Sequence, residues 1–146
     1  MTARAIKFID THSHLQVERL DGHRAQWLAQ AREAGLENIL LCAGAPEDWE
    51  RTLSTAHEWG LGAMLGIHPL WLDSTTPAEL VGLRELAESL LDDPHFIGLG
   101  EVGLDGFEPG LDQHKAEQVF LEELKIARDL DLPLLSLIHI SEPTRH

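Results

Sequence analysis

The sequence predicts an α/β fold in which short parallel strands alternate with amphipathic helices. Short apolar segments recur along the chain, and between them the apolar residues repeat every three or four positions, which is the helical period. The apolar segments are almost continuously hydrophobic, as is typical of strands buried on both faces of a parallel sheet. Helices are therefore expected to cover the sheet.

Five strands and four helices follow one another along the 146 residues, which is enough for one domain or part of one. The strands are predicted at 6–10, 38–44, 63–67, 96–104 and, beginning the fifth, 132–135. The helices are predicted at 22–34, 46–60, 77–91 and 111–130. Gly35 and Gly60 are expected to end the first two helices, and Pro46 to begin the second.

The composition favours a globular protein of the cytoplasm. Hydrophobic residues make up 43% of the chain, but no run approaches the roughly 18 apolar residues of a membrane span. The N-terminal MTARAIKFID lacks the apolar region of a signal peptide. The single cysteine, Cys42, is predicted to be a small buried side chain. Nothing indicates a membrane or a protein partner.

The charge is one-sided, with 11 basic against 25 acidic residues and a net charge of −14. A protein that holds nucleic acid by its backbone usually carries a basic stripe, and none is visible here. The scattered acidic residues are expected to form a solvated surface. An anionic substrate would therefore have to be attracted by cations bound inside the site.

The segment IKFIDTHSHL places two histidines, His12 and His14, just beyond the first predicted strand. Side chains alternate along extended backbone, so both imidazoles point the same way and are placed to bind one divalent ion. Taken alone, this motif also fits a pair of surface histidines. Asp10 is expected either to brace the loop or an imidazole, or to cap the end of the strand.

Polar residues also follow the other predicted strands. Ligands of parallel α/β folds bind at the carboxyl ends of the strands. The residues at these positions are Asp10, His12, His14, Gly44, Ala45, His68, Pro69, Glu101 and Asp105. This set predicts a metal site spread over three strands, which is more specific than the two histidines alone. The remaining histidines of the predicted helices and their ends are expected to face solvent: His23, His57, His95 and His114.

Three motifs, IDTHSHL, GIHP and GEVGLD, resemble in their order and spacing the TatD family of metal-dependent hydrolases, which are amidohydrolase-like TIM barrels. The resemblance runs from Ile6 to Leu134. It implies the N-terminal part of a (β/α)8 barrel with one or two divalent ions, for which magnesium, manganese and zinc are candidates. It also implies hydrolysis of small esters or phosphodiesters, DNA ends included.

The resemblance assigns roles to particular residues. His12 and His14 are implied as ligands of one ion, and Glu101 as the catalytic carboxylate that reaches one or both ions. His68 is implied to line the substrate pocket and act in catalysis without binding the metal. Asp105 is implied to contact the substrate. A divalent ion held in this way would activate water and polarise the bond under attack.

The chain departs from the family in its length. A TIM barrel needs about 250 residues, whereas this sequence stops in or just after its fifth strand, so residues 1–134 are expected to form the N-terminal half of a barrel. The family would continue with a histidine after strand five, another after strand six and an aspartate after strand eight. His139 lies six residues beyond Pro133, where about four would be expected, and is out of register.

Residues 135–146 are predicted to be a non-native read-through tail. The stretch LSLIHISEPTR matches, codon for codon, the translation of a transposase sequencing adapter. On this interpretation neither His139 nor His146 is a ligand. The alternative is a natural short C-terminus.

Three functions are compatible with the sequence. The parent protein is expected to be a TatD-like hydrolase, of which this fragment alone is inactive. An amidohydrolase-like barrel acting on C–N or lactone bonds is an alternative within enzymes, and a substrate screen would separate the two. A non-catalytic metal-binding relic is the third, which would lack the downstream histidines and aspartate.

Overall fold

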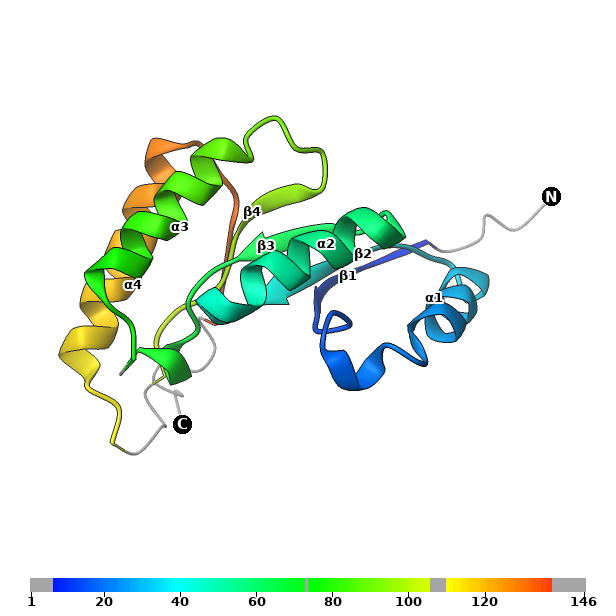
Figure 1. Ribbon diagram of the computed structural model, residues 1–146, viewed down its shortest axis with the longest axis horizontal. Helices are drawn as coiled ribbons and strands as arrows, with labels where there is room; N and C mark the ends of the chain where they lie inside the picture. The colour runs from blue at the N-terminus through cyan, green and yellow to red at the C-terminus, as the bar shows by residue number, and fades with distance from the viewer. Residues whose placement is uncertain (1–6, 73, 106–109, 138–146) are drawn as a thin grey trace, which may run out of the picture.

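The computed structural model describes residues 7–72, 74–105 and 110–137, which form one parallel sheet with helices against it (Figure 1). The strand order is β1-β2-β3-β4-β5, and every neighbouring pair is parallel. The strands are β1 (Phe8–Ser13), β2 (Leu36–Ala43), β3 (Gly62–Leu65), β4 (Phe96–Val102) and β5 (Leu134–Ser136). This order confirms the predicted α/β class and is that of consecutive strands in a (β/α)8 barrel.

A helix follows each of the first four strands. The helices are α1 (Arg24–Glu33), α2 (Trp49–Trp59), α3 (Pro77–Ser89) and α4 (Gln113–Asp129), with 3-10 turns η1 (Glu18–Leu20), η2 (Pro46–Asp48) and η3 (Pro69–Trp71). Thr76 and Glu79 form a capping box at the start of α3, and Gly60 ends α2 in the left-handed conformation, at a φ of 66°. None of the described helices combines the length and apolar character that crossing a bilayer requires.

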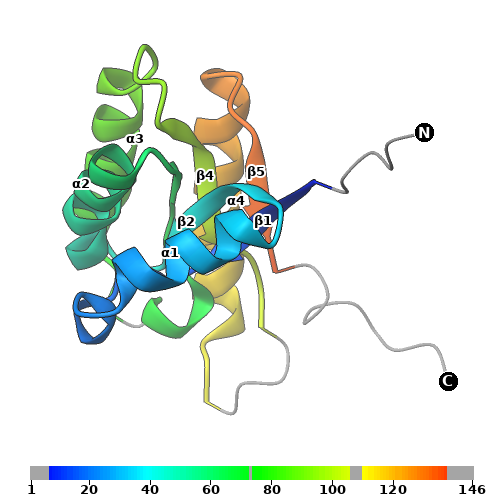
Figure 2. The same cartoon turned by 90° about the vertical axis from the view of Figure 1, so that its right-hand side faces the viewer.

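Two apolar clusters fill the space between the helices and the sheet. The larger cluster includes Leu65 of β3, Leu83 of α3, Leu99 of β4 and Ile126 of α4. The smaller one joins residues of α1 and β2 to the start of β3. Figure 2 shows α2 and α3 together on one side of the strands. Cys42 is buried in β2, as predicted.

The first strand differs from its prediction. The sequence predicts a buried strand at 6–10, whereas β1 runs from Phe8 to Ser13 and is largely exposed, with Phe8 and Ile9 at 53% and 60%. The reason is that β1 lies at an edge of the described sheet and pairs there with β2 alone. Because β1 extends to Ser13, Asp10 and His12 lie within the strand, and of the motif's two histidines only His14 follows it.

The fifth strand crosses the predicted boundary after residue 134. Strand β5 begins at Leu134, which pairs with Leu99, and it continues to Ser136, which pairs with Val102. The rest of the predicted tail, residues 138–146 with His139 and His146, lies outside the described residues.

Candidate metal centre

Three potential metal ligands converge at the carboxyl end of the sheet. They are His12 near the end of β1, His14 just after it, and Glu101 near the end of β4. One ligand atom from each lies within 4.8 Å of the others. In a flat sheet β1 and β4 would be about 14 Å apart, at about 4.8 Å per strand. The convergence therefore depends on the curl of the sheet.

Both imidazoles face the same carboxylate oxygen. The Nε2 atoms of His12 and His14 lie 3.2 and 3.5 Å from Oε2 of Glu101. The two rings meet edge to face, with centroids 5.2 Å apart. Glu101 is buried, whereas both histidines are exposed on the open side. The predicted common direction of the two histidines is thus what the structure has.

A backbone contact orients His14. Its Nδ1 lies 2.9 Å from the carbonyl oxygen of Cys42 in β2. Because a carbonyl oxygen can only accept, Nδ1 carries the hydrogen, which leaves Nε2 as the ring nitrogen available to a metal ion. Gln16, which is buried, donates through Nε2 to the same carbonyl at 2.7 Å. This tautomer is the one that a metal ligand bound through Nε2 requires.

Asp10 contacts the backbone of the histidine motif. Its Oδ1 accepts the backbone N–H of His12 at 3.1 Å. This backbone contact is compatible with both roles considered for Asp10, a brace of the loop and a cap at the strand end.

His68 approaches Glu101 from the other side and in the opposite tautomer. It precedes η3, and its Nε2 lies 3.5 Å from Oε1 of Glu101. Its Nδ1 accepts the backbone N–H of Leu70 at 3.0 Å, so Nε2 carries the hydrogen and has no lone pair to offer a metal. Burial lowers the pKa of His68, although the negative charges of Glu101 and Asp105 act to raise it. The ring is therefore a neutral hydrogen-bond donor.

Two other predicted residues border His68. The carboxylate of Asp105, just past β4, is close enough for its charge to act on the His68 ring. Gly44, just past β2, accepts the backbone N–H of His68 at 2.8 Å. A Cβ on Gly44 would lie only 3.0 Å from Cβ of His68, so the glycine permits this close approach.

A cavity of about 230 Å³ opens over these groups. Its lining joins His14, His68 and Glu101 to Gln16 and Trp71. Sequence reasoning missed Gln16 and Trp71, although each follows a motif within three residues. Convergent titratable groups in a cavity are the usual mark of an active site.

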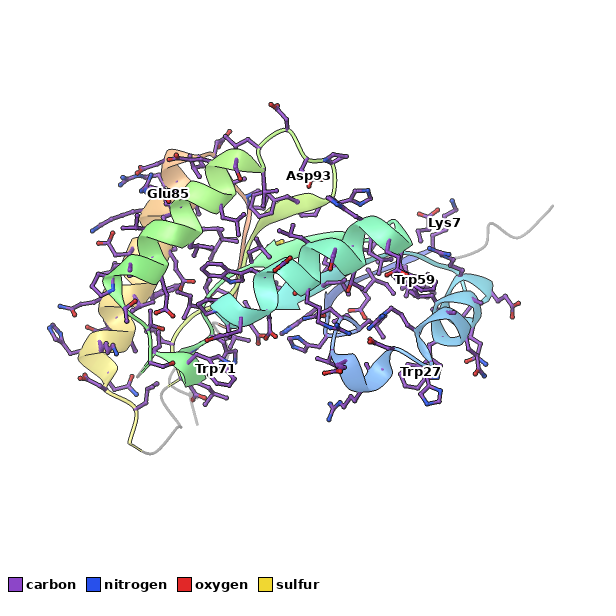
Figure 3. All side chains as sticks on the ribbon, viewed as in Figure 1. Lys7, Trp27, Trp59, Trp71, Glu85 and Asp93 are labelled. Carbon is purple, nitrogen blue, oxygen red and sulfur yellow. The ribbon has the colours of Figure 1, made fainter. Side chains whose placement is uncertain are left out.

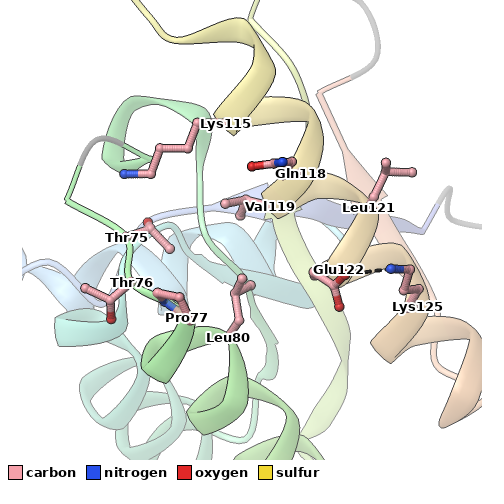
Figure 4. Close-up of a pocket in the computed structure, with 10 residues that line it drawn as sticks. All are labelled: Thr75, Thr76, Pro77, Leu80, Lys115, Gln118, Val119, Leu121, Glu122 and Lys125. Atoms are coloured by element: carbon pink, nitrogen blue, oxygen red, sulfur yellow. Dashed lines mark hydrogen bonds and ion pairs between the residues drawn. The ribbon is translucent and has the colours of Figure 1, made fainter.

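A second groove, of about 360 Å³, lies between α3 and α4 and shares no residue with the metal ligands (Figure 4). Apolar Leu80, Val119 and Leu121 line it, and its Lys125 is paired with Glu122 at 2.6 Å. It is larger than the cavity over Glu101, but it gathers no cluster of potential ligands. The chemistry therefore belongs to the smaller cavity.

The remaining histidines are only partly as predicted. His23 and His114 are exposed on the helix layer. His95 is not on a helix: it precedes β4, is half-buried, and its Nδ1 lies 2.8 Å from the carbonyl oxygen of Leu61. His57 is exposed but bound, with Nε2 at 2.7 Å from Oδ2 of Asp93. The expectation that His95 faces solvent is wrong, because its ring is held by the loop before β3.

Several known proteins resemble this chain in sequence. The chain is 32% identical over 131 residues to the uncharacterized metal-dependent hydrolase YjjV of Escherichia coli, covering 88% of this chain and 49% of that protein. It is 27% identical over 126 residues to the 3'-5' ssDNA/RNA exonuclease TatD of Cronobacter turicensis, covering 86% and 46%. The chain spans about half the length of the curated relatives it matches.

Solved structures share the fold over the same range. The crystal structure of YjjV superposes with a TM-score of 0.82 at 31% identity, covering 88% of this chain and 49% of that one. The hydrolase TatD family protein of Entamoeba histolytica superposes with a TM-score of 0.77 at 19% identity, covering 92% and 50%. The five strands are thus the N-terminal part of a TIM barrel.

The family profile described as TatD related DNase matches residues 9–145 of this chain. The match includes all three motifs that carry His12, His14, His68 and Glu101. By profile, by sequence identity and by fold, the chain belongs to the TatD related DNase family.

Proposed function

We propose that the protein of which this chain forms a part hydrolyses phosphodiester bonds of nucleic acids with one or two divalent ions held by His12, His14 and Glu101. The observation that carries the proposal is the convergence of these three side chains from two non-adjacent strands. Relatives named as a metal-dependent hydrolase and an ssDNA/RNA exonuclease support the reaction class. Family membership supports the substrate class.

The donor set fits a divalent ion. Two imidazole nitrogens and a carboxylate oxygen suit magnesium, manganese or zinc to different degrees, and three protein ligands leave coordination positions open. The hydrogen bond from His14 to Cys42 fixes the tautomer that ligation through Nε2 needs. When bound, such an ion supplies Lewis acidity, which polarises a phosphoryl oxygen and makes water acidic enough to attack near neutral pH.

Glu101, His68 and Asp105 have different roles around the site. Glu101 turns Oε2 toward His12 and His14 and leaves Oε1 facing His68. The neutral His68 carries its hydrogen on Nε2, so it can donate to a phosphoryl oxygen placed in the cavity. Asp105 lies on the same rim, where we place it beside the substrate.

The charge of this chain bears on the substrate. With a net charge of −14, the chain has no excess of cations to neutralise a duplex backbone. Attraction for phosphate must then come from ions inside the site. We therefore expect weak binding of duplex DNA. The relative named as an ssDNA/RNA exonuclease supports preferential cleavage of single-stranded ends.

The test uses the full-length protein encoded by the intact gene. Metal content is measured by plasma mass spectrometry, and hydrolysis is followed with labelled single-stranded and duplex oligonucleotides, before and after chelation. The variant His12→Ala with His14→Ala is expected to lose bound metal and activity together, while the exposed His23→Ala retains both. If the double variant kept its metal content and its hydrolysis, the site assignment would be wrong.

A further inference from the structure

A single peptide unit just beyond β3 is bound on both sides by helix side chains. The strand ends at Leu65, and the second peptide beyond it joins Gly66 to Ile67. Its carbonyl oxygen accepts the indole N–H of Trp49 at 3.0 Å, and its N–H donates to Oε1 of Glu123 at 2.7 Å. The two side chains come from different helices, α2 and α4.

This arrangement replaces the strand ladder where the ladder stops. The described pairing of β3 with β4 ends at Leu65 and Leu99, so the N–H of Ile67 has no partner on β4. Glu123 is 1% exposed and Ile67 is completely buried, so bulk water does not reach this N–H. A buried N–H without an acceptor is costly, which makes Glu123 a specific requirement of this peptide.

The peptide lies next to both sides of the candidate site. His68 follows Ile67 directly in the chain, and its Nε2 faces Glu101. On the other side, Gly66 packs so closely on β4 that a Cβ there would come within 2.9 Å of the backbone oxygen of Glu101. A rotation of this peptide would therefore displace His68 relative to Glu101.

We propose that Glu123 is a positioning residue for the candidate site. Together with Trp49, it fixes the Gly66–Ile67 peptide and thereby the distance between the His68 ring and the Glu101 carboxylate. This inference rests on the proposed function only for its kinetic consequence. What Glu123 supplies is an acceptor and not a charge: burial raises its pKa well above the usual value, so the neutral acid is the favoured form.

The acceptor role makes a graded prediction for the full-length protein. Glu123→Gln keeps an amide oxygen at the position of Oε1 and is expected to retain kcat within about twofold. Glu123→Leu keeps the volume but removes the acceptor, and is expected to lower kcat about tenfold at unchanged metal content, since small misplacements of reacting groups are costly. Trp49→Phe keeps an aromatic ring, removes the donor on the opposite side, and is expected to act in the same direction.

Matched controls separate positioning from stability. Ile126→Ala removes a buried side chain from the same helix and leaves both hydrogen bonds to the peptide in place, and it is expected to lower the melting temperature while kcat is kept. In spectra of protein labelled with ¹⁵N and with ¹³C at the histidine rings, Glu123→Leu is expected to shift the Ile67 amide and the His68 ring resonances. Ile126→Ala is expected to leave both in place.

The two kinds of failure are distinguishable. If the folded Glu123→Leu variant kept wild-type kcat and unshifted His68 resonances, the positioning role would be overturned. If Glu123→Gln were as damaging as Glu123→Leu, the acceptor argument would fall. A wild-type protein without chelator-sensitive hydrolysis would refute the proposed function alone, because the shifts of Ile67 and His68 would still test the positioning.

Discussion

Two clusters of histidines around a carboxylate lie at opposite ends of the sheet. They differ in how many of their polar atoms form short hydrogen bonds. At the amino end, Asp93 uses both oxygens: Oδ2 contacts His57 at 2.7 Å and Oδ1 accepts the backbone N–H of His95 at 2.9 Å. At the carboxyl end, Glu101 faces His12, His14 and His68 at 3.2 to 3.5 Å. Figure 3 places Asp93 well away from Trp71, which lines the cavity over Glu101.

The difference shows how the same residue types serve structure or ligand binding. The Asp93 cluster is closed, because short hydrogen bonds tie α2 to the loop before β4. The Glu101 cluster is open, because its imidazole nitrogens stand at distances longer than a typical hydrogen bond and converge beside a cavity. Composition alone does not separate the two, whereas geometry does.

The largest effect is expected from isolating the part of the chain that holds both clusters. Residues 1–134 would retain His12, His14 and Glu101, but the sheet would expose apolar side chains such as Phe8 and Ile9 at its β1 edge. We expect this fragment to aggregate and to show no detectable metal-dependent hydrolysis. Size-exclusion chromatography and a chelator-sensitive phosphodiesterase assay, beside the full-length protein, measure both; a monodisperse and active fragment would contradict the expectation.

Sequencing of the intact gene complements this experiment. The reading frame is expected to diverge from the present sequence after Leu134 and to encode two further histidines and an aspartate. A genomic sequence that reproduces LSLIHISEPTR and then stops would remove the read-through interpretation.

The second prediction compares the two carboxylates directly in the full-length protein. Glu101→Gln removes the negative charge that neutralises part of the charge of a bound cation. It is expected to lower kcat about 100-fold or more and to weaken metal binding. Asp93→Asn, at the other end of the sheet, is expected to leave kcat within about twofold. Equal losses from the two substitutions would mean that the clusters do not differ in function. Steady-state kinetics with measured metal content provides the comparison.

A smaller effect is expected from crowding His68. In Gly44→Ala the new methyl group would lie about 3.0 Å from Cβ of His68, so the ring must shift. We expect kcat to fall about tenfold while metal content stays at the wild-type level, since His12 and His14 are untouched. Gly22→Ala is the matched control, because a Cβ there meets nothing within 4 Å. A Gly44→Ala protein with unchanged kcat would contradict the expected effect of this close contact on the reaction.

The smallest effect concerns stability at the closed cluster. The backbone N–H of His95 and the ring of His57 lower the pKa of Asp93, although partial burial opposes them. A carboxyl group whose pKa is lowered on folding stabilises the protein above its unfolded pKa, near 3.8, and that contribution is lost as the pH falls through the lower folded value. Asp93→Asn is expected to cost about 1 kcal/mol of unfolding free energy at pH 6.

The pH dependence of that cost is the decisive measurement. In urea unfolding of the full-length protein, the difference between wild type and Asp93→Asn should shrink as the pH falls below about 4. A difference that grew at low pH would have the wrong sign for a carboxylate stabilised in the folded state.

The sequence by itself determined the order of strands and helices, because their apolar periods and their caps are local properties. It also determined which side chains gather at the carboxyl ends, since motifs directly following strands share one edge of a parallel sheet. His12 and His14 share a direction because strand side chains alternate. The family resemblance rested on the same local segments.

Only the tertiary structure decided what these residues do to one another. The curl of the sheet brings Glu101 to His12 across two intervening strands, and no local pattern encodes that distance. The opposite tautomers of His14 and His68 depend on which backbone group each ring meets. Likewise, the buried carboxyl group of Glu123 in α4 accepts the N–H of Ile67, which lies 56 residues earlier in the chain. Such contacts are long-range, so their partners are set by packing and not by sequence spacing.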